Sequence, residues 1–141
     1  MSLEMRPISE KDLSDLETWE MLCFPEDAWT KKMLLNHLEF HAAYLAFGER
    51  AQGYALICET PWEVEIFRIA TLPNYHRLGV ATFLLHSLFQ EFPSKDFFLE
   101  LRENNKTALN LYQKVGFGIL ETRKNYYPNG ETAILMKRKP N

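Results

Sequence analysis

Three strand-type segments follow one another between residues 42 and 71, with no helical segment between them. Residues 42–46 and 52–58 are separated by GERAQ, a hairpin-type turn that contains Gly48, and residues 62–71 supply the third segment. Parallel strands need a long crossover connection, whereas antiparallel strands can follow one another through short turns. The order therefore excludes a regular doubly wound fold and predicts a mixed α/β or α+β sheet.

The other elements are predicted from apolar periodicity and from residues that favour helix ends. Before the three strands, we expect a short strand near Met5–Ile8, a helix that follows a Ser9–Asp12 capping box and ends before Pro25, and a helix capped by Thr30. After them, we expect a helix from Gly79 to Phe92, a strand over residues 96–102, and a helix capped by Asn104 or Asn105 and ended by Gly116. The last two strands are expected over residues 117–122 and 133–137, around a PNG turn. The predicted order of elements is βααβββαβαββ.

Length and composition limit the size of the protein and the kind of partner it can have. With 141 residues, the chain is expected to form one domain over residues 1–141. A net charge of −3 and a pI near 5.8 argue against nucleic-acid binding, so a small molecule or a peptide is the expected partner. No metal is expected, because Cys23 and Cys58 form no CxxC pair and the four histidines lack metal-ligand spacing. Without an apolar signal core or a membrane-spanning stretch, a cytoplasmic protein with reduced cysteines and no membrane partner is predicted.

The segment YHRLGVATFLL, residues 75–85, places Gly79 where a helix begins after a strand and Pro73. The first backbone N–H groups of a helix lack internal partners and favour an anion, and a glycine lets that anion approach the backbone. Arg77 could add positive charge. The chain has neither GxxxxGK[ST] nor GxGxxG, so the common nucleotide-binding loops are excluded. Taken alone, the segment fits either an anion site or a simple turn into a helix.

Several segments, in the same order, resemble the GNAT (GCN5-related N-acetyltransferase) superfamily. HRLGVA, residues 76–81, is similar to its Q/R-x-x-G-x-G/A motif, with His76 at a position where the family usually has Gln or Arg. CFPEDAW (residues 23–29), LELRENNKTALNLYQKVGF (99–117) and RKNYYPNGETAILM (123–136) resemble the ribosomal-protein-alanine N-acetyltransferase branch, the RimI type. The resemblance implies the GNAT fold, in which helices flank a central mixed, mostly antiparallel sheet.

By this resemblance, acetyl-CoA is the acetyl donor and binds along one strand end and one helix start. Its pyrophosphate is expected on the backbone of Arg77, Leu78, Gly79, Val80, Ala81 and Thr82. Its pantetheine arm is expected beside Ile69, Ala70, Thr71 and Leu72, and Asn105 is expected to contact CoA. From the residues alone, the first segment is only the end of a strand and Asn105 only a helix cap.

Two polar residues in apolar settings are candidates for acid–base chemistry. Glu100 interrupts the apolar strand DFFLELR and shares a face with Phe98 and Arg102, because side chains alternate along a strand. It could pair with Arg102 or lie on a solvated face; the resemblance implies the general base that deprotonates the acceptor ammonium. Tyr112 lies on the apolar side of its helix, where packing is the usual role of a tyrosine. The resemblance implies the general acid that protonates the departing CoA thiolate.

The third strand carries a second candidate base. In residues 62–71 the side chains of Val64, Ile66 and Arg68 are expected to alternate with those of Glu65, Phe67 and Ile69. Glu65 could serve as a base, and a surface charge explains it as well. Arg68 stands where members of the family commonly carry Asn.

Aromatic residues are expected to enclose the acceptor. By the resemblance, Phe24 and Trp29 form one wall of a groove and Tyr126 and Tyr127 form the other, although simple hairpin packing also explains the tyrosines. The implied acceptor, and hence the expected partner, is a protein N-terminus, namely the N-terminal alanine of a small-subunit ribosomal protein. Two alternatives remain: acetylation of a lysine side chain or small amine, and a noncatalytic acetyl-CoA-binding module. A base and an acid together speak against the module.

Overall fold

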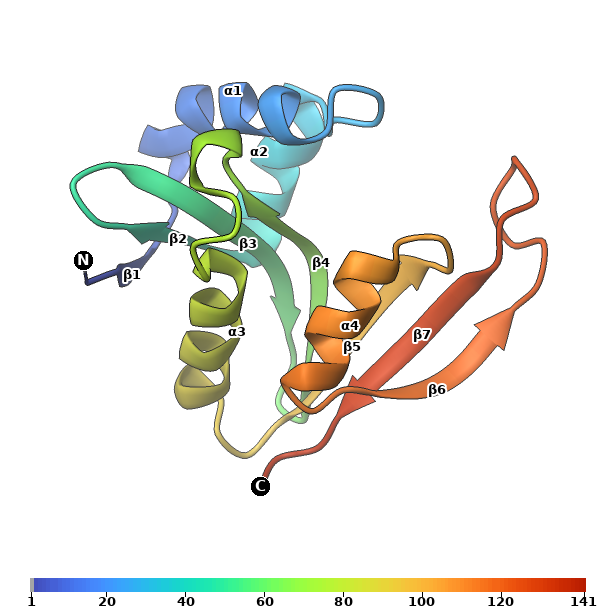
Figure 1. Cartoon of the computed structure of the whole chain (residues 1–141). Coiled ribbons are helices and arrows are strands. Elements are labelled where there is room, and N and C mark those ends of the chain that lie inside the picture. Colours follow the sequence, from blue (N-terminus) through green and yellow to red (C-terminus); the bar gives the residue numbers. More distant parts are fainter. Residues whose placement is uncertain (1) are drawn as a thin grey trace.

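The computed structural model describes residues 2–141, which build a seven-stranded sheet with helices on both faces (Figure 1). The strands are β1 (Glu4–Pro7), β2 (Ala42–Phe47), β3 (Ala51–Glu59), β4 (Glu63–Thr71), β5 (Asp96–Arg102), β6 (Gly118–Arg123) and β7 (Ala133–Arg138). The helices are α1 (Leu13–Cys23), α2 (Lys31–Phe40), α3 (Val80–Glu91) and α4 (Lys106–Lys114), and short 3-10 helices cover Glu10–Asp12 and Pro73–Tyr75. The predicted order βααβββαβαββ is confirmed, and differences are confined to the ends of elements.

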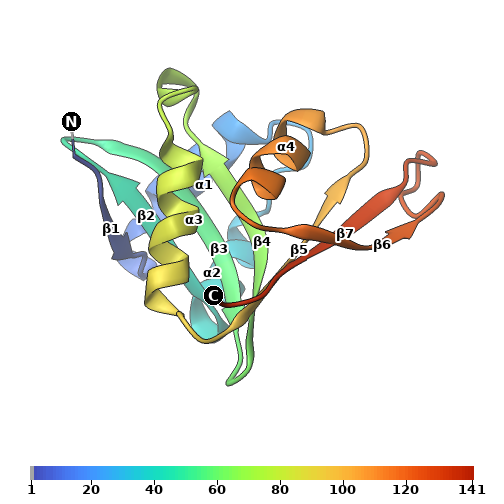
Figure 2. The same cartoon turned by 60° about the horizontal axis from the view of Figure 1, so that its bottom comes forward.

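The sheet has the strand order β1-β2-β3-β4-β5-β7-β6, and all neighbours are antiparallel except β4 and β5. This arrangement confirms the prediction of a mixed, mostly antiparallel sheet. The parallel pairing is short, because only Glu63–Ile66 of β4 pairs with Asp96–Leu99 of β5. Beyond these residues the two strands run apart, and β5, β7 and β6 leave the plane of the first four strands (Figures 1 and 2). The sheet is therefore open at the C-terminal ends of its two parallel strands.

A β-bulge in β4 accompanies this opening. Leu56 of β3 pairs with Arg68, whereas the next residue, Ile57, pairs with Ile66, so Phe67 is an extra residue. Such an insertion bends the bulged strand and increases its twist. The alternation predicted over residues 62–71 is wrong beyond Ile66, because Phe67 and Arg68 both contact residues of the first two helices.

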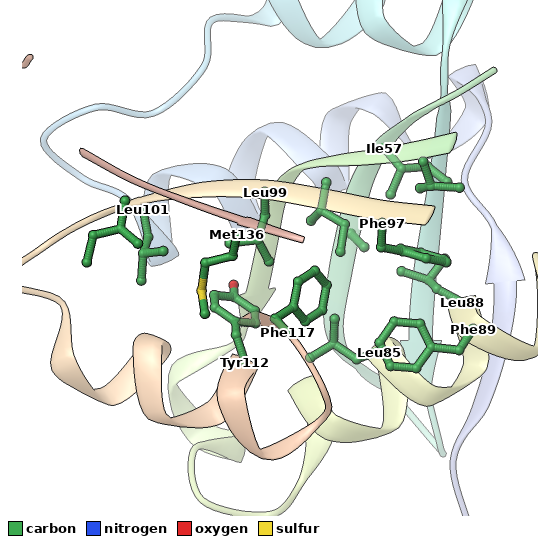
Figure 3. Close-up of a cluster of buried hydrophobic side chains, with 14 residues drawn as sticks. Ile57, Leu85, Leu88, Phe89, Phe97, Leu99, Leu101, Tyr112, Phe117 and Met136 are labelled. Atoms are coloured by element: carbon green, nitrogen blue, oxygen red, sulfur yellow. The ribbon is translucent and has the colours of Figure 1, made fainter. Parts of the chain in front are cut away.

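Different pairs of helices cover the two faces of the sheet. On the face of α3 and α4, a buried cluster includes Leu85, Leu88 and Phe89 of α3, Tyr112 of α4, Phe97, Leu99 and Leu101 of β5, and Met136 of β7 (Figure 3). On the face of α1 and α2, Leu16 and Leu34 pack against β3. Burying a side chain of this size stabilises the fold by about 1.5–3 kcal/mol. The central strand β3 is buried on both faces over residues 52–57, which holds the two layers together.

Local signals in the sequence explain the ends of several helices. The Thr30 hydroxyl accepts a hydrogen bond from the Met33 amide at 3.2 Å, which confirms it as the cap of α2. Of the two asparagines predicted for α4, Asn105 is the cap, because its side chain accepts from the Ala108 amide at 3.2 Å. Gly116, with a φ of 106°, follows the end of α4 as predicted. No helix within residues 2–141 is long and apolar enough to cross a bilayer.

Candidate active site

A cleft of about 610 Å³ lies where β4 and β5 diverge. Its walls come from the loop after α1, the bulged part of β4, the end of β5, the start of α4 and the connection between β6 and β7. Of the residues predicted for the site, Phe24, Ile69, Glu100, Asn105, Tyr112 and Tyr127 line the cleft. Ligand sites commonly lie outside the carboxyl ends of parallel strands at such an opening.

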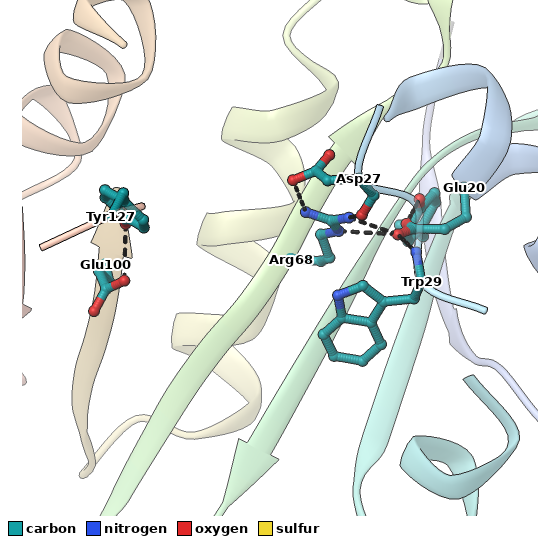
Figure 4. Close-up of polar contacts among 7 residues, drawn as sticks. Glu20, Asp27, Trp29, Arg68, Glu100 and Tyr127 are labelled. Carbon is teal, nitrogen blue, oxygen red and sulfur yellow. Dashed lines mark hydrogen bonds and ion pairs between the residues drawn. The ribbon is translucent and has the colours of Figure 1, made fainter. Parts of the chain in front are cut away.

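Glu100 lies on the more exposed face of β5 and accepts a hydrogen bond from the Tyr127 hydroxyl at 2.8 Å (Figure 4). The alternation predicted for this strand is confirmed, because buried and more exposed residues follow one another along it. Arg102 does not neutralise Glu100: its guanidinium lies 3.9 Å from the Tyr127 ring centroid and 3.7 Å from Glu131. Among residues 2–141 Glu100 forms no ion pair, so its carboxylate is available to a group that enters the cleft.

Tyr112 combines a packed ring with a place on the cleft wall. Its ring contacts Phe117 edge-on, with 5.7 Å between the ring centroids, which confirms the packing role. Burial alone raises the pKa of Tyr112 to about 12. The phenol therefore keeps its proton at neutral pH and can donate it to a group that binds in the cleft. Its role as a general acid remains a prediction.

The end of β4 offers unpaired backbone groups to a ligand. On one side, Ile69, Ala70 and Thr71 pair with β3. On the side facing β5, the pairing stops at Ile66, so the N–H and C=O groups of the following residues have no strand partner there. An extended chain can add itself to such an edge through main-chain hydrogen bonds. This geometry fits the predicted contact of the strand end with pantetheine.

The start of α3 has the backbone that an anion site requires. Arg77 has a φ of 67° and Gly79 a φ of 81°, so two residues of this turn are in the left-handed region. A Cβ added at Gly79 would meet no atom within 4 Å, and no side chain among residues 2–141 caps the helix. The first N–H groups of α3 are therefore not bonded by a capping side chain, and the helix dipole favours a negative charge beside them.

His76, the departure from the family motif, stabilises the same turn. Its Nε2 lies 3.1 Å from the Thr71 carbonyl oxygen, a hydrogen bond when this nitrogen carries the proton. The bond joins the loop before α3 to the end of β4. His76 thus holds together the two segments that are expected to bind the two halves of acetyl-CoA.

Gly53 was not predicted to matter for the site. A Cβ at this position in β3 would lie 2.5 Å from the Ala70 carbonyl oxygen and 2.7 Å from Val80 Cγ1. Only glycine therefore lets the start of α3 and the end of β4 approach β3 this closely. A glycine inside a predicted strand is the available sequence signal for such an approach.

A buried ion pair beneath the cleft was also not predicted. Arg68 donates two hydrogen bonds to one Glu20 carboxylate oxygen, from Nε at 3.0 Å and from Nη2 at 2.8 Å (Figure 4). The Trp29 amide donates to the same oxygen at 2.8 Å, and the Tyr54 hydroxyl donates to the other. Glu20 is fully buried. The sequence signal was an arginine in an apolar strand segment, since a buried charge needs a partner.

The two predicted walls of the acceptor groove are only partly in the cleft. Phe24 and Tyr127 line the cleft. Trp29 is not among the lining residues and packs against His37 and Phe67. Tyr126 is 49% exposed and contacts Tyr127 edge-on, so it lies at the rim. Trp29 packs against the lining residue Phe67, and Tyr126 packs against the lining residue Tyr127. Contact of Trp29 and Tyr126 with an acceptor remains a prediction.

The other chemical candidates lie outside this cleft. Glu65 pairs with Phe98 across the sheet and is not among the lining residues. Burial and the nearby carboxylates of Glu63 and Glu100 raise its pKa. Within the described part of the chain, no group of three or more His, Cys, Asp or Glu side chains is placed to hold a metal ion.

Comparison with known sequences finds one family. A sequence model described as "Acetyltransferase (GNAT) family" matches residues 4–117. The chain is 33% identical over 117 residues to a [ribosomal protein bS18]-alanine N-acetyltransferase of Haemophilus ducreyi, a match that covers 77% of this chain and 81% of that protein. It is 37% identical over 91 residues to an N-alpha-acetyltransferase of Sulfurisphaera tokodaii, covering 60% of this chain. The match spans only 54% of that archaeal relative, so the chain covers about half its length.

Comparison with solved structures agrees on the fold. The crystal structure of the ribosomal-protein-S18-alanine N-acetyltransferase from Escherichia coli superposes with a TM-score of 0.89. The superposition covers 98% of this chain and 94% of the other at 26% sequence identity. The splayed sheet is thus an arrangement shared with this enzyme.

Proposed function

The chain belongs to the acetyltransferase (GNAT) family, and from this premise we propose that it transfers the acetyl group of acetyl-CoA to the N-terminal α-amine of a protein. The acceptor we propose is the N-terminal alanine of a small-subunit ribosomal protein. One observation carries the proposal: the cleft at the open end of β4 and β5 brings together Glu100, Tyr112 and the unpaired edge of β4.

The donor end of the proposed site runs from the start of α3 to the cleft. The uncapped helix start at Gly79 suits the pyrophosphate, and the segment from Ile69 to Leu72, of which the β4 part has no partner on β5, suits the pantetheine arm. His76 connects the two through its bond to Thr71. This arrangement would place the thioester near Tyr112, which lies in the second turn of α4 and lines the cleft.

The acceptor chemistry needs a base, a polarised carbonyl and a proton donor. Glu100 accepts the proton of the acceptor ammonium, directly or through water, which leaves a neutral amine to attack the thioester carbonyl. The new C–N bond forms as the C–S bond breaks, and Tyr112 gives its proton to the departing thiolate. The nitrogen carries one extra proton after the attack; it loses this proton to solvent as the amide forms, and solvent returns a proton to the Tyr112 phenolate. Cys23 takes no part, because burial and the charge of Glu20 raise the pKa of its thiol.

The choice of a protein N-terminus rests on the relatives and on the shape of the acceptor side. The Haemophilus ducreyi relative is named for the alanine of ribosomal protein bS18. Phe24 and Tyr127 line the cleft from two separate loops, so an acceptor that enters it would lie between these aromatic rings. The net charge of −3 is compatible with a basic ribosomal target.

Product mass spectrometry on a panel of acceptors tests this proposal. The panel contains a peptide with the N-terminus of a bS18-type protein, the same peptide with a blocked N-terminus and an internal lysine, and a polyamine. We expect acetylation of the free N-terminus only. Acetylation confined to the lysine or the polyamine would refute the acceptor, and acetyl-CoA binding without turnover would favour a noncatalytic module.

The Glu100→Gln variant is the matched control for turnover. It keeps the side-chain shape and can still contact Tyr127, but it cannot accept a proton. General acid–base groups contribute about 10²–10⁴-fold, so we expect turnover to fall by about that factor while acetyl-CoA affinity is retained. Unchanged turnover would remove Glu100 from the mechanism.

A further inference from the structure

Arg68 is the centre of a polar network that joins four separate segments. Its guanidinium bonds to Glu20 of α1, and the Glu20 carboxylate also accepts from Trp29 in the following loop and from Tyr54 of β3. Arg68 Nη2 donates in addition to the Asp27 carbonyl oxygen at 2.7 Å. The bonds tie the loop between α1 and α2 to the two central strands (Figure 4).

The same network shapes the cleft wall that belongs to β4. The Phe24 ring covers the guanidinium, with 3.8 Å between the ring centroid and Arg68 Cζ. Phe24, Asp27 and Arg68 all line the cleft that contains Glu100. Only 13% of the Arg68 side chain is exposed, so this part of the cleft wall is well packed and hydrogen-bonded. Glu20 and Arg68 thus contact this loop at three residues: Phe24, Asp27 and Trp29.

Stabilisation of the fold does not by itself explain the buried ion pair between Arg68 and Glu20. Burying both charges costs several kcal/mol per ion, and a well-packed apolar pair would often serve the fold as well. Removing one partner, however, leaves an unpaired buried charge and releases what the pair holds. The structural consequence that depends on this pair is the position of the loop from Phe24 to Trp29.

The geometry points to a role for Arg68 in acceptor choice. We propose that Arg68 is a specificity-determining positioning residue, which holds the Phe24–Trp29 loop against the sheet and thereby restricts the acceptor to a small first side chain. This inference rests on the proposed function. In an N-terminal acceptor the first side chain branches from the carbon bonded to the reacting amine, so it must lie next to the cleft walls. In this proposal a large side chain meets Phe24 or the guanidinium, and it can displace them only if the hydrogen bonds of Arg68 break.

Kinetics on peptides that differ only at the first residue test the proposal. The peptides begin with Ala, Ser, Met or Leu, and KM and kcat are measured for each at saturating acetyl-CoA. For Arg68→Met, which keeps an apolar contact for Phe24 but removes the ion pair, we expect the preference for Ala over Met to fall about tenfold or more. The rise in KM should be largest for the Ala peptide, and KM for acetyl-CoA should stay within about twofold. A merely structural role would lower the active fraction equally for all peptides and leave the ratio unchanged.

Two further variants provide controls. Arg68→Lys keeps the charge but loses the planar, multi-donor geometry of the guanidinium, so we expect its preference for the Ala over the Met peptide to lie between those of the wild type and Arg68→Met. This variant replaces Arg68→Met if the latter does not fold. Arg6→Met breaks another arginine–carboxylate pair, with Asp12 at 3.0 Å, which is more exposed than the Arg68–Glu20 pair and does not line the cleft. Arg6→Met should keep the wild-type ratio of Ala to Met.

Hydrogen exchange separates failure of this inference from failure of the proposed function. In Arg68→Met the amides of residues 24–30 should exchange at least about tenfold faster than in the wild type, and in Arg6→Met they should not. Unchanged exchange, or an unchanged Ala-to-Met ratio in a folded variant, overturns the role of Arg68. A wild-type protein that acetylates none of the peptides refutes the proposed function instead, and the exchange measurement still decides whether Arg68 holds the loop.

Discussion

Replacing Gly79 with alanine separates the two things that this residue does. Its φ of 81° and ψ of 16° lie in the left-handed region, which costs an L-residue roughly 1–2 kcal/mol. Alanine also loses less chain entropy on folding, which returns about 0.4–1 kcal/mol. The added methyl would meet no atom within 4 Å, so no steric term arises within the protein. The net expectation is a loss of about 1 kcal/mol of stability, or a fall in Tm of about 3–4 °C.

The effect on CoA binding should be larger than this small loss of stability. The methyl group would extend into unoccupied space at the residue that immediately precedes α3, beside the backbone on which the pyrophosphate is expected. We expect the Kd for CoA, measured by calorimetry on the folded variant, to rise at least about tenfold, which is 1.4 kcal/mol. Tm is measured in parallel without CoA.

Two variants make this prediction refutable. Gly116→Ala also places a methyl group on a residue with positive φ, here 106°, and its Cβ would lie 3.4 Å from Arg138 Nε. It lies beyond the far end of α4, so stability should fall while CoA affinity is unchanged. Gly79→Asn should recover stability, since asparagine tolerates the left-handed region, without recovering affinity. If Gly79→Ala binds CoA as tightly as Gly116→Ala does, the pyrophosphate does not lie on this helix start. If neither alanine variant loses stability, the backbone argument is wrong.

Three further predictions concern the acid, the packing and the pH dependence. Tyr112→Phe should keep CoA affinity but slow acetyl transfer in single-turnover experiments by about 10²-fold, and an undiminished chemical step would exclude Tyr112 as the acid. Gly53→Ala should cost about 1–3 kcal/mol in urea unfolding, because its Cβ would lie 2.5 Å from the Ala70 carbonyl oxygen; a neutral effect would mean that the strands separate freely. Burial lowers the pKa of His37 in the folded protein, whereas in the unfolded chain it has the ordinary histidine value of about 6.5. Near and below that pH the unfolded chain binds more protons than the folded protein, so stability should fall as the pH drops through this value. The slope between pH 7.5 and 5.5 should be smaller in His37→Gln, and an equal slope would assign the effect to other groups.

The order of the elements and several of their ends can be predicted from the amino-acid sequence alone. Three consecutive strand segments exclude a doubly wound sheet, and Thr30 and Asn105 cap the helices that follow them. These features depend on neighbours a few residues away, so they can be predicted from a short stretch of chain. The motif around Gly79 belongs to the same class, because a left-handed residue before a helix is a local property.

Which side chains meet in the cleft depends on how distant segments of the chain pack together. The extra residue Phe67 changes the face of Arg68, and a one-residue change of register cannot be seen in the apolar pattern of β4 alone. Arg68 then meets Glu20, 48 residues earlier in the chain, and Gly53 admits the backbone of Ala70. Such contacts depend on how distant segments pack, so the sequence could nominate Glu100 and Tyr112 as candidates but could not identify the wall that faces them.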